Sequence, residues 1–386
     1  MTDTAEVIVV GLGAAGAAAL YQLARRGVRA VGLDRFSPPH DRGSSHGETR
    51  ITRHAVGEGE VYAPLAIRSH EIWRELEAAT GARLLETCGL LTLAPADGSA
   101  TAHGVSDFLG RAASVARTFD IPHERLSLDE VRARWPQFVL AGDEAALFEP
   151  GAGFLRPERC ISTQLAEAQR LGAGVVLEAP VFSIEEAGEA VRVVSPAGTF
   201  EADRVVVAAG AWSPELIGGP FRRLTLQPQS LHWFECEDPA AFSPSRFPAF
   251  MWIRGGEPED SFYGFPLVGA PDRGVKMACE SQDSIARIAD FDRTPPATAG
   301  AKVFERHIRG RIRGIGPRVL SSAMCVYSTT PDSGFAVGWT SDRVLAASGC
   351  SGHGFKHSAA LGELLAKVVS GSARRIPPEF ALQRLA

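Results

Sequence analysis

The sequence predicts an α/β protein in which a parallel-sheet domain carries an inserted domain built on a mixed or antiparallel β-sheet. Two observations indicate the first domain: an apolar strand at residues 7–10 that runs into a Gly-x-Gly-x-x-Gly turn, and a strand and helix near the C-terminus, at residues 344–369. One observation indicates the insertion. From residue 224 to residue 278, short strand-like runs are separated by Pro and Gly.

The N-terminal glycines have the spacing of a Rossmann-like dinucleotide-binding turn. Val and Ile on both faces of the preceding strand suit the centre of a parallel sheet. Gly11 permits the tight turn, Gly13 lets the backbone approach a pyrophosphate, and Gly16 lets the next helix pack on the strand. A second strand at residues 30–33 ends in Asp34, whose carboxylate can accept hydrogen bonds from ribose hydroxyls. The motif therefore predicts a bound dinucleotide, and it does not by itself distinguish NAD from FAD.

The remaining elements follow from hydrophobic periodicity and from cap and turn residues. We expect helices at residues 14–26, 58–79, 106–119, 157–171, 298–309 and 355–369. Ser127 and Glu130 have the spacing of a capping box that opens another short helix, which Pro136 ends. We expect further strands at residues 88–93, 174–177, 181–185, 190–195, 199–202, 204–208, 231–235, 250–254, 262–265, 274–278 and 344–347.

The order of these elements places one domain inside the other. We expect the nucleotide-binding domain to comprise residues 1–83, 153–218 and 323–386, and the inserted catalytic domain to comprise residues 84–152 and 219–322. A chain of 386 residues is too long for one simple core, which agrees with two intimately packed domains.

Composition and charge narrow the class of protein. Hydrophobic residues make up 45% of the chain and charged residues 22%, which is ordinary for a soluble globular protein. The net charge of −5 provides no basic surface for nucleic acid. The apolar run at residues 7–20 is interrupted by glycines and preceded by acidic residues, which argues against a signal peptide or a membrane span. The six cysteines lack paired or metal-like spacing, so we expect a reduced, cytoplasmic protein without a metal site.

Several motifs spread along the chain resemble the family of monomeric sarcosine oxidase and N-methyltryptophan oxidase. They are Gly43 to His54 followed by Gly57-Glu58-Gly59, Ala209 to Trp212, Tyr263 to Pro266 with Lys276, Cys325 to Thr330, and Ser351 to Lys356. The match is collinear over nearly the whole chain. The Ser-His-Gly-x-Thr-Arg and Ser-Gly-His-Gly-Phe-Lys motifs are specific to this family.

The resemblance implies both a fold and a reaction. The fold would be an FAD-binding domain of the glutathione-reductase type joined to a mixed-sheet catalytic domain, in a monomer. The reaction would oxidise an N-methyl or cyclic amino acid with O2, giving an imine that hydrolyses, and hydrogen peroxide. The expected ligands are therefore FAD, a small amino-acid substrate and O2.

The resemblance also assigns residues to the cofactor. In the family, the cysteine that matches Cys325 forms a thioether with the 8α carbon of the flavin, so we expect covalent FAD. The matching His46 and Arg50 lie against the flavin ring and stabilise its anionic reduced form. Further expected cofactor contacts are Ser45, Gly352, Gly354 and Lys356.

The resemblance implies that a second group of residues binds the substrate and activates O2. Arg53 and Lys356 match a pair of cations that hold the substrate carboxylate, which suits a desolvated pocket. Lys276 matches the lysine that activates O2, where a fixed cation stabilises superoxide. Residues that match the amine side of the pocket are Tyr263, Tyr327 and Glu58.

Two departures from the family bear on specificity. Glu280 stands where sarcosine-specific members have a pocket histidine, and Cys350 replaces a common aromatic residue. We expect sarcosine to be a poorer substrate than a larger N-alkyl or cyclic amino acid. Two other functions remain open: a flavin-dependent dehydrogenase that passes electrons to a quinone or carrier, and a non-enzymatic flavoprotein.

Overall fold

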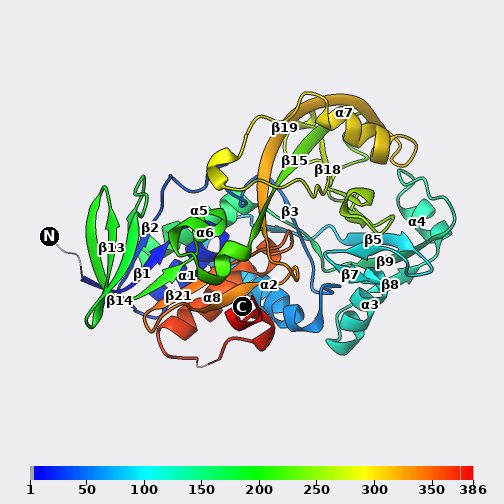
Figure 1. Ribbon diagram of the computed structural model, residues 1–386. Helices are drawn as coiled ribbons and strands as arrows, with labels where there is room; N and C mark the ends of the chain where they lie inside the picture. The colour runs from blue at the N-terminus through cyan, green and yellow to red at the C-terminus, as the bar shows by residue number, and fades with distance from the viewer. Residues whose placement is uncertain (1–3, 374, 386) are drawn as a thin grey trace.

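The computed structural model describes residues 4–373 and 375–385 and has two lobes (Figure 1). One lobe contains both the first strand and the last helix of the chain, as the sequence predicts, together with the helices that cover them. The other lobe is built on a second large sheet. None of the helices in these described ranges is long and apolar enough to cross a membrane.

The sheet of the first lobe has eight strands. Its main path is β11-β2-β1-β14-β13-β12, and β21 lies beside β14 with β20 on its other side. The strands are β1 (Thr4–Val10), β2 (Ala30–Leu33), β11 (Gly174–Val176), β12 (Ser183–Ala187), β13 (Ala190–Ser195), β14 (Gly198–Val207), β20 (Ala336–Trp339) and β21 (Val344–Ser348). Five of them, β11, β2, β1, β14 and β21, pair in parallel.

One strand of this sheet differs from the sequence-based expectation. Residues 199–202 and 204–208 were expected to form two strands, but residues 198–207 form the single strand β14. The first half of β14 pairs with β13 and the second half with β21, while β1 runs along both halves. Because β14 changes its neighbour on one edge only, the polar residues near its middle do not interrupt it.

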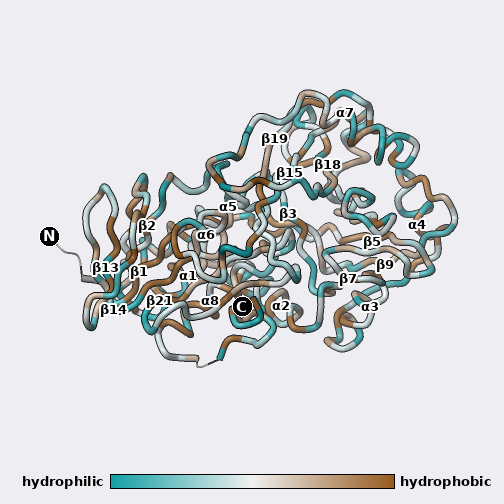
Figure 2. The backbone as a smooth tube through the Cα atoms, viewed as in Figure 1, coloured by the Kyte–Doolittle hydropathy of each residue, from teal (hydrophilic) through white to brown (hydrophobic). Residues whose placement is uncertain are grey.

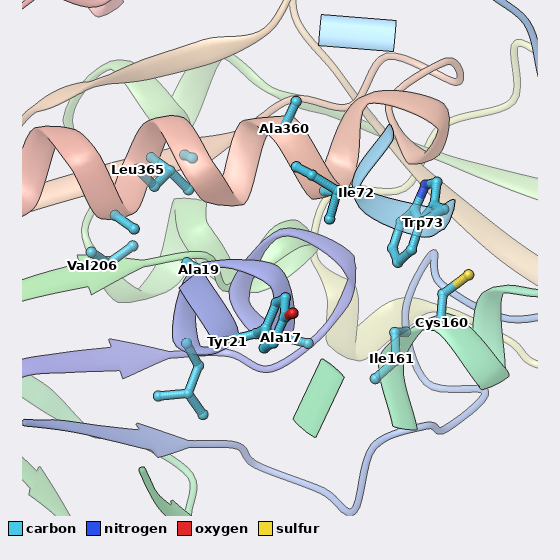
Figure 3. Close-up of a cluster of buried hydrophobic side chains, with 14 of the residues drawn as sticks. Ala17, Ala19, Tyr21, Ile72, Trp73, Cys160, Ile161, Val206, Ala360 and Leu365 are labelled. Atoms are coloured by element: carbon cyan, nitrogen blue, oxygen red, sulfur yellow. The ribbon is translucent and has the colours of Figure 1, made fainter. Parts of the chain in front are cut away.

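Four helices pack on one another beside this sheet. They are α1 (Ala14–Arg25), α2 (Ala63–Thr80), α5 (Pro157–Arg170) and α8 (Ser358–Val369). Of these, α1, α5 and α8 contact its strands. Figure 3 shows Ala17, Ala19 and Tyr21 of α1, Leu365 of α8 and Trp73 of α2, which belong to one buried cluster. Small residues let these helices approach closely and hold α1 in place at the end of β1.

The second sheet is mixed and also has eight strands. Their order is β19-β15-β18-β17-β16-β5-β9-β8, in which only β16 and β5 pair in parallel among the described strands. The strands are β5 (Leu90–Pro95), β8 (Glu124–Leu126), β9 (Glu144–Glu149), β15 (Thr225–Cys236), β16 (Ala249–Trp252), β17 (Phe262–Gly264), β18 (Val275–Cys279) and β19 (Ile315–Thr329). Its core is rich in buried aromatic rings, including Phe138, Phe247 and Phe250.

Smaller elements complete the two lobes. They are β3 (Arg50–Thr52), β4 (Leu85–Glu86), β6 (Thr101–Ala102), β7 (Val105–Ser106), β10 (Gly153–Leu155), α3 (Phe108–Thr118), α4 (Leu128–Arg134), α6 (Ser213–Leu216) and α7 (Ala299–Val303). The capping box at α4 is confirmed, because the Ser127 hydroxyl accepts from the Glu130 amide and the Glu130 carboxylate accepts from the Ser127 amide.

The longest strand, β19, was not expected from the sequence. It has 15 residues and pairs with β15 along its length, so it passes through the expected domain boundary between residues 322 and 323. Much of its first half is exposed or half-buried, which explains the weak apolar pattern there (Figure 2). Its second half carries Cys325 and Tyr327 toward the first lobe (Figure 1).

Candidate active site

A cavity of about 400 Å³ begins at the glycine turn after β1 and ends at the C-terminal part of β19. Gly11 and Asp34 line one end, and Tyr327 and Gly352 line the other. The fold therefore brings together the two segments of the sequence that carry the strongest motifs.

The glycine turn leaves room for a ligand beside α1. A methyl group at Gly16 would overlap the Gly11 carbonyl oxygen, and one at Gly11 would lie 2.6 Å from the Ala208 carbonyl oxygen, so both positions require glycine. No side chain caps the start of α1 through its N-cap residue Gly13, and the first turn carries no acidic residue. The Ala14 amide donates to the Ser45 hydroxyl, 3.3 Å away. The amides at the start of α1 and the helix dipole suit a pyrophosphate.

Asp34 lies at the same end of the cavity and is 6% exposed. One carboxylate oxygen accepts from the Leu12 amide at 2.6 Å, and the other accepts from the Phe36 amide at 2.8 Å. The second of these oxygens also lies 3.5 Å from His40 Nε2, whereas the oxygen bonded to Leu12 keeps a free lone pair that could accept from a ribose. Its contact with a ribose stays a prediction.

At the other end of the cavity, Arg50 lies between the glycine-rich loop and β19. Its guanidinium donates to the Ser44 carbonyl oxygen at 3.0 Å and to the Cys325 sulfur at 3.4 Å. Burial raises the pKa of the Cys325 thiol, and the Arg50 charge opposes this rise by stabilising the thiolate. His46 is buried, its Nε2 has no partner among the described residues, and burial together with Arg50 lowers its pKa to about 4. His46 is therefore neutral and has a free nitrogen, and its neighbour Ser45, not His46 itself, lines the cavity.

Lys276 extends from β18 to the backbone beside Arg50. Its ammonium donates to the Gly47 carbonyl oxygen at 2.7 Å, to the Thr49 carbonyl oxygen at 2.9 Å and to the Thr49 hydroxyl at 3.2 Å. Three acceptors match the three N–H bonds of an ammonium. Burial and the nearby Arg50 charge nevertheless push the pKa of Lys276 well below its usual value.

The two cations expected to hold a substrate carboxylate, Arg53 and Lys356, lie together but hold a carboxylate of the protein. Arg53 donates to both oxygens of Glu58 at 2.8 and 2.9 Å, and Lys356 donates to one of them at 3.0 Å. All three side chains are 3–4% exposed. Burial opposes the charge of Glu58, but Arg53 and Lys356 outweigh it and hold the Glu58 pKa well below its usual range. Burial lowers the pKa of Lys356 to about 7 in spite of Glu58.

The other expected site residues gather around these groups. Tyr263 and Tyr327 are hydrogen-bonded to each other, and burial raises the pKa of both phenols. A methyl group at Gly352 would lie 2.8 Å from the Tyr327 ring and 3.5 Å from a Glu280 carboxylate oxygen. Glu280 therefore lies next to Gly352, which lines the cavity. Cys350 lines the cavity directly.

No motif in the sequence points to His103, which lies between the two carboxylates of the site. Its Nδ1 is 3.2 Å from Glu58 and its Nε2 is 3.1 Å from Glu280. The Ala-His-Gly-Val sequence around it signals a tight turn, but only the folded chain places this turn beside Glu58, 45 residues earlier.

The donors and acceptors along the cavity fit FAD. The uncapped N-terminus of α1 suits a pyrophosphate, and Asp34 suits a ribose. The Arg50 guanidinium, which lines the cavity, suits a polar ring that gains negative charge.

Comparison with known proteins agrees with this assignment. Residues 6–368 match the family model of FAD dependent oxidoreductases called DAO. The chain is 35% identical over 377 residues to monomeric sarcosine oxidase of Streptomyces avermitilis, covering 95% of this chain and 94% of that protein. It is 36% identical over 366 residues to N-methyl-L-tryptophan oxidase of Yersinia pestis, covering 94% of each.

A solved structure of NikD, an unusual amino acid oxidase essential for nikkomycin biosynthesis, superimposes with a TM-score of 0.83. It covers 100% of this chain and 98% of that one, at 20% identity, and so supports the fold alone. Together, the family match, the two relatives and the cavity show that this chain belongs to the DAO family of FAD-dependent oxidoreductases.

Proposed function

We propose that the protein is an FAD-dependent oxidase of secondary amino acids. The observation that carries the proposal is the buried pair of Arg53 and Lys356, which converge on one carboxylate beside the flavin end of the cavity. When bound there, FAD supplies the acceptor for a hydride from the substrate and passes the electrons to O2. The protein supplies position, charge and the exclusion of water.

Arg53 and Lys356 orient the substrate by its carboxylate. Two cations can serve two carboxylates, so a substrate can share them with Glu58 or displace Glu58 from one of them. Arg53 and Lys356 donate three hydrogen bonds to Glu58, so both cations have a carboxylate partner before a substrate binds. Tyr263 and Tyr327 then border the amine end of the substrate.

Lys276 and Arg50 serve the oxygen step. Lys276 is buried and Arg50 lines the flavin end of the cavity beside it, and charge forms on oxygen during the transfer of electrons. Lys276 is already fixed by three oxygen acceptors, so its position need not change during the reaction.

The covalent link through Cys325 is a further part of this proposal. Its support is the Arg50 guanidinium 3.4 Å from the Cys325 sulfur, a position that favours the thiolate needed for attack on a flavin. We expect Cys325→Ser to bind FAD that acid precipitation releases, whereas wild type gives a fluorescent pellet. Cys350→Ser is the matched control, because Cys350 lines the same cavity. Release of all the flavin from the wild-type pellet would contradict the covalent link.

The activity itself is tested by peroxide release. We expect hydrogen peroxide from N-methyl or cyclic amino acids, with N-methyl-L-tryptophan, L-proline or pipecolate preferred to sarcosine by kcat/KM. The physical reason is the wall formed by Glu280 and the small Cys350. Turnover with a quinone but not with O2 would support the dehydrogenase alternative. No bleaching of the flavin by any amino acid without oxygen would support the non-enzymatic alternative.

A further inference from the structure

His103 is held in place by an unusual backbone conformation. It lies in the two-residue turn between β6 and β7, and both turn residues have positive φ, 49° at His103 and 75° at Gly104. This is the backbone of a type I′ hairpin, in which Asn, Asp or Gly is favoured at the first position. A histidine there costs on the order of 1 kcal/mol. A strained backbone of this kind is retained where the side chain has a structural or functional role.

The side chain of His103 inserts between two carboxylates. It is 9% exposed, and its two ring nitrogens lie 3.2 Å from Glu58 and 3.1 Å from Glu280. Both nitrogens must carry protons to donate to both carboxylates, which defines an imidazolium. Burial opposes this charge, but Glu280 and Glu58 outweigh it and raise the His103 pKa to about 9.

The third ionisable group that faces His103 is His353, whose ring centroid is 5.4 Å away. Its Nε2 lies 2.9 Å from the Ser333 carbonyl oxygen, so it carries a proton and Nδ1 does not. Burial and the Lys356 charge lower its pKa to about 3. His353 is therefore neutral and does not change the charge of the site.

We define the charge cluster as Arg53, Glu58, His103, Glu280 and Lys356. It contains three cationic groups and two carboxylates, linked by contacts of 2.8–3.2 Å. Below about pH 7, where Lys356 is protonated as well, its net charge is one positive unit. A buried cluster with one unpaired charge favours a ligand that carries the opposite charge.

A secondary amino acid exists in two relevant forms. The zwitterion has no net charge, whereas the form with a neutral amine carries one negative charge. Only the neutral amine has the lone pair that assists loss of hydride from carbon. The charge cluster matches this monoanionic, oxidisable form.

We propose that His103 is a positioning residue that holds Glu280 and supplies the unpaired positive charge by which the site selects the monoanionic form of a secondary amino acid. This proposal deepens the proposed function and rests on it. Without His103 the cluster would be neutral, and the zwitterion would bind as well as the anion.

The first test measures binding without turnover. The probe is methylthioacetate, in which sulfur replaces the amine, titrated into the flavin-loaded protein at about pH 6.5 and followed by flavin absorbance. We expect His103→Asn, which suits the left-handed turn, to weaken the probe about tenfold. Glu280→Gln should bind it more tightly than wild type, and the double variant should lie between the two single variants.

Two controls separate charge from packing. His103→Lys restores a cation and should recover most of the lost affinity, although it does not restore the imidazole shape. His123→Asn replaces a histidine that contacts the Ile121 carbonyl oxygen, away from the cluster, and should leave the affinity unchanged. Equal weakening by His103→Asn and Glu280→Gln, or failure of His103→Lys to recover binding, would overturn the proposal.

The second test separates this proposal from the proposed function. Without oxygen, the rate of flavin bleaching by N-methyl-L-tryptophan is measured against pH. We expect the apparent pKa of the bound amine to rise by about one unit in His103→Asn and to fall in Glu280→Gln. Bleaching with the same pKa in all variants would overturn the role of His103 and leave the oxidase intact. Absence of bleaching in wild type would overturn the proposed oxidase function. The binding of methylthioacetate would still test whether His103 makes the site select an anion.

Discussion

At the scale of single residues, Lys276 combines a low pKa with a full set of acceptors. The three oxygens around its ammonium come from Gly47 and Thr49, in the loop that also leads to Arg50. The rings of Phe265 and Trp233 lie 4.8 and 5.6 Å from its nitrogen, which excludes water from this side. A fixed, dry cation is suited to a step in which negative charge appears on a small molecule.

We therefore expect Lys276→Met to slow the reoxidation of reduced flavin by O2 on the order of 100-fold, because the fixed charge near oxygen is lost. The rate of flavin reduction by substrate should change much less. Stopped-flow absorbance measures both steps separately. Lys302→Met, at an exposed lysine of α7, should change neither rate. Normal reoxidation in Lys276→Met would show that Lys276 does not serve the oxygen step.

At the scale of elements, the contact between α1 and α8 holds the dinucleotide turn in place. A methyl group at Gly362 of α8 would overlap Ala18 of α1. The two helices can touch at this point only because position 362 has no side chain. Since α1 begins at the Gly11 end of the cavity, a shift of α1 also moves the amides at the start of this helix.

We expect Gly362→Ala to lower the free energy of unfolding by about 1–3 kcal/mol, as overpacked cores do, and to weaken the retention of FAD. Thermal unfolding and the flavin content of the purified protein measure the two effects. Gly256→Ala is the control, because no heavy atom lies within 4 Å of a methyl group at Gly256. Equal stability of the two variants would mean that α8 moves away from α1 at little cost.

At the scale of the whole molecule, the charge cluster ties together distant parts of the chain. Arg53 and Glu58 follow β3, His103 lies between β6 and β7, Glu280 follows β18, and Lys356 precedes α8. Their ion pairs therefore contribute to the contact between the two lobes (Figure 1). The stability of the assembled molecule should depend on the protonation of this cluster.

The sign of this dependence follows from His103. Its pKa is about 9 in the folded protein and about 6.5 in an unfolded chain, so the folded state binds more protons between these values. The stabilisation is complete below about pH 6.5 and is lost as pH rises through 9. We expect the Tm difference between wild type and His103→Asn to shrink from pH 6.5 to pH 10, with His123→Asn as control. A constant difference would show that His103 is not charged in the folded protein.

Much of the fold can be predicted from the sequence because its signals are local. The apolar run before Gly11, the three turn glycines and the capping box at Ser127 each act within a few residues, and all form the expected elements. The exposed half of β19 has no such signal. Its strand exists because β15 supplies hydrogen-bonding partners along its whole length, which no local pattern reports.

The same distinction holds for the site. The sequence by itself determined the chemical inventory: a dinucleotide turn, Arg53 and Lys356 as cations, and Cys325 in its motif. The tertiary structure alone decided that Glu58 lies between those cations and that His103 joins Glu58 to Glu280. The physical reason is that the charge of a buried group depends on neighbours from other segments of the chain. Those neighbours are defined only when the two lobes have packed together.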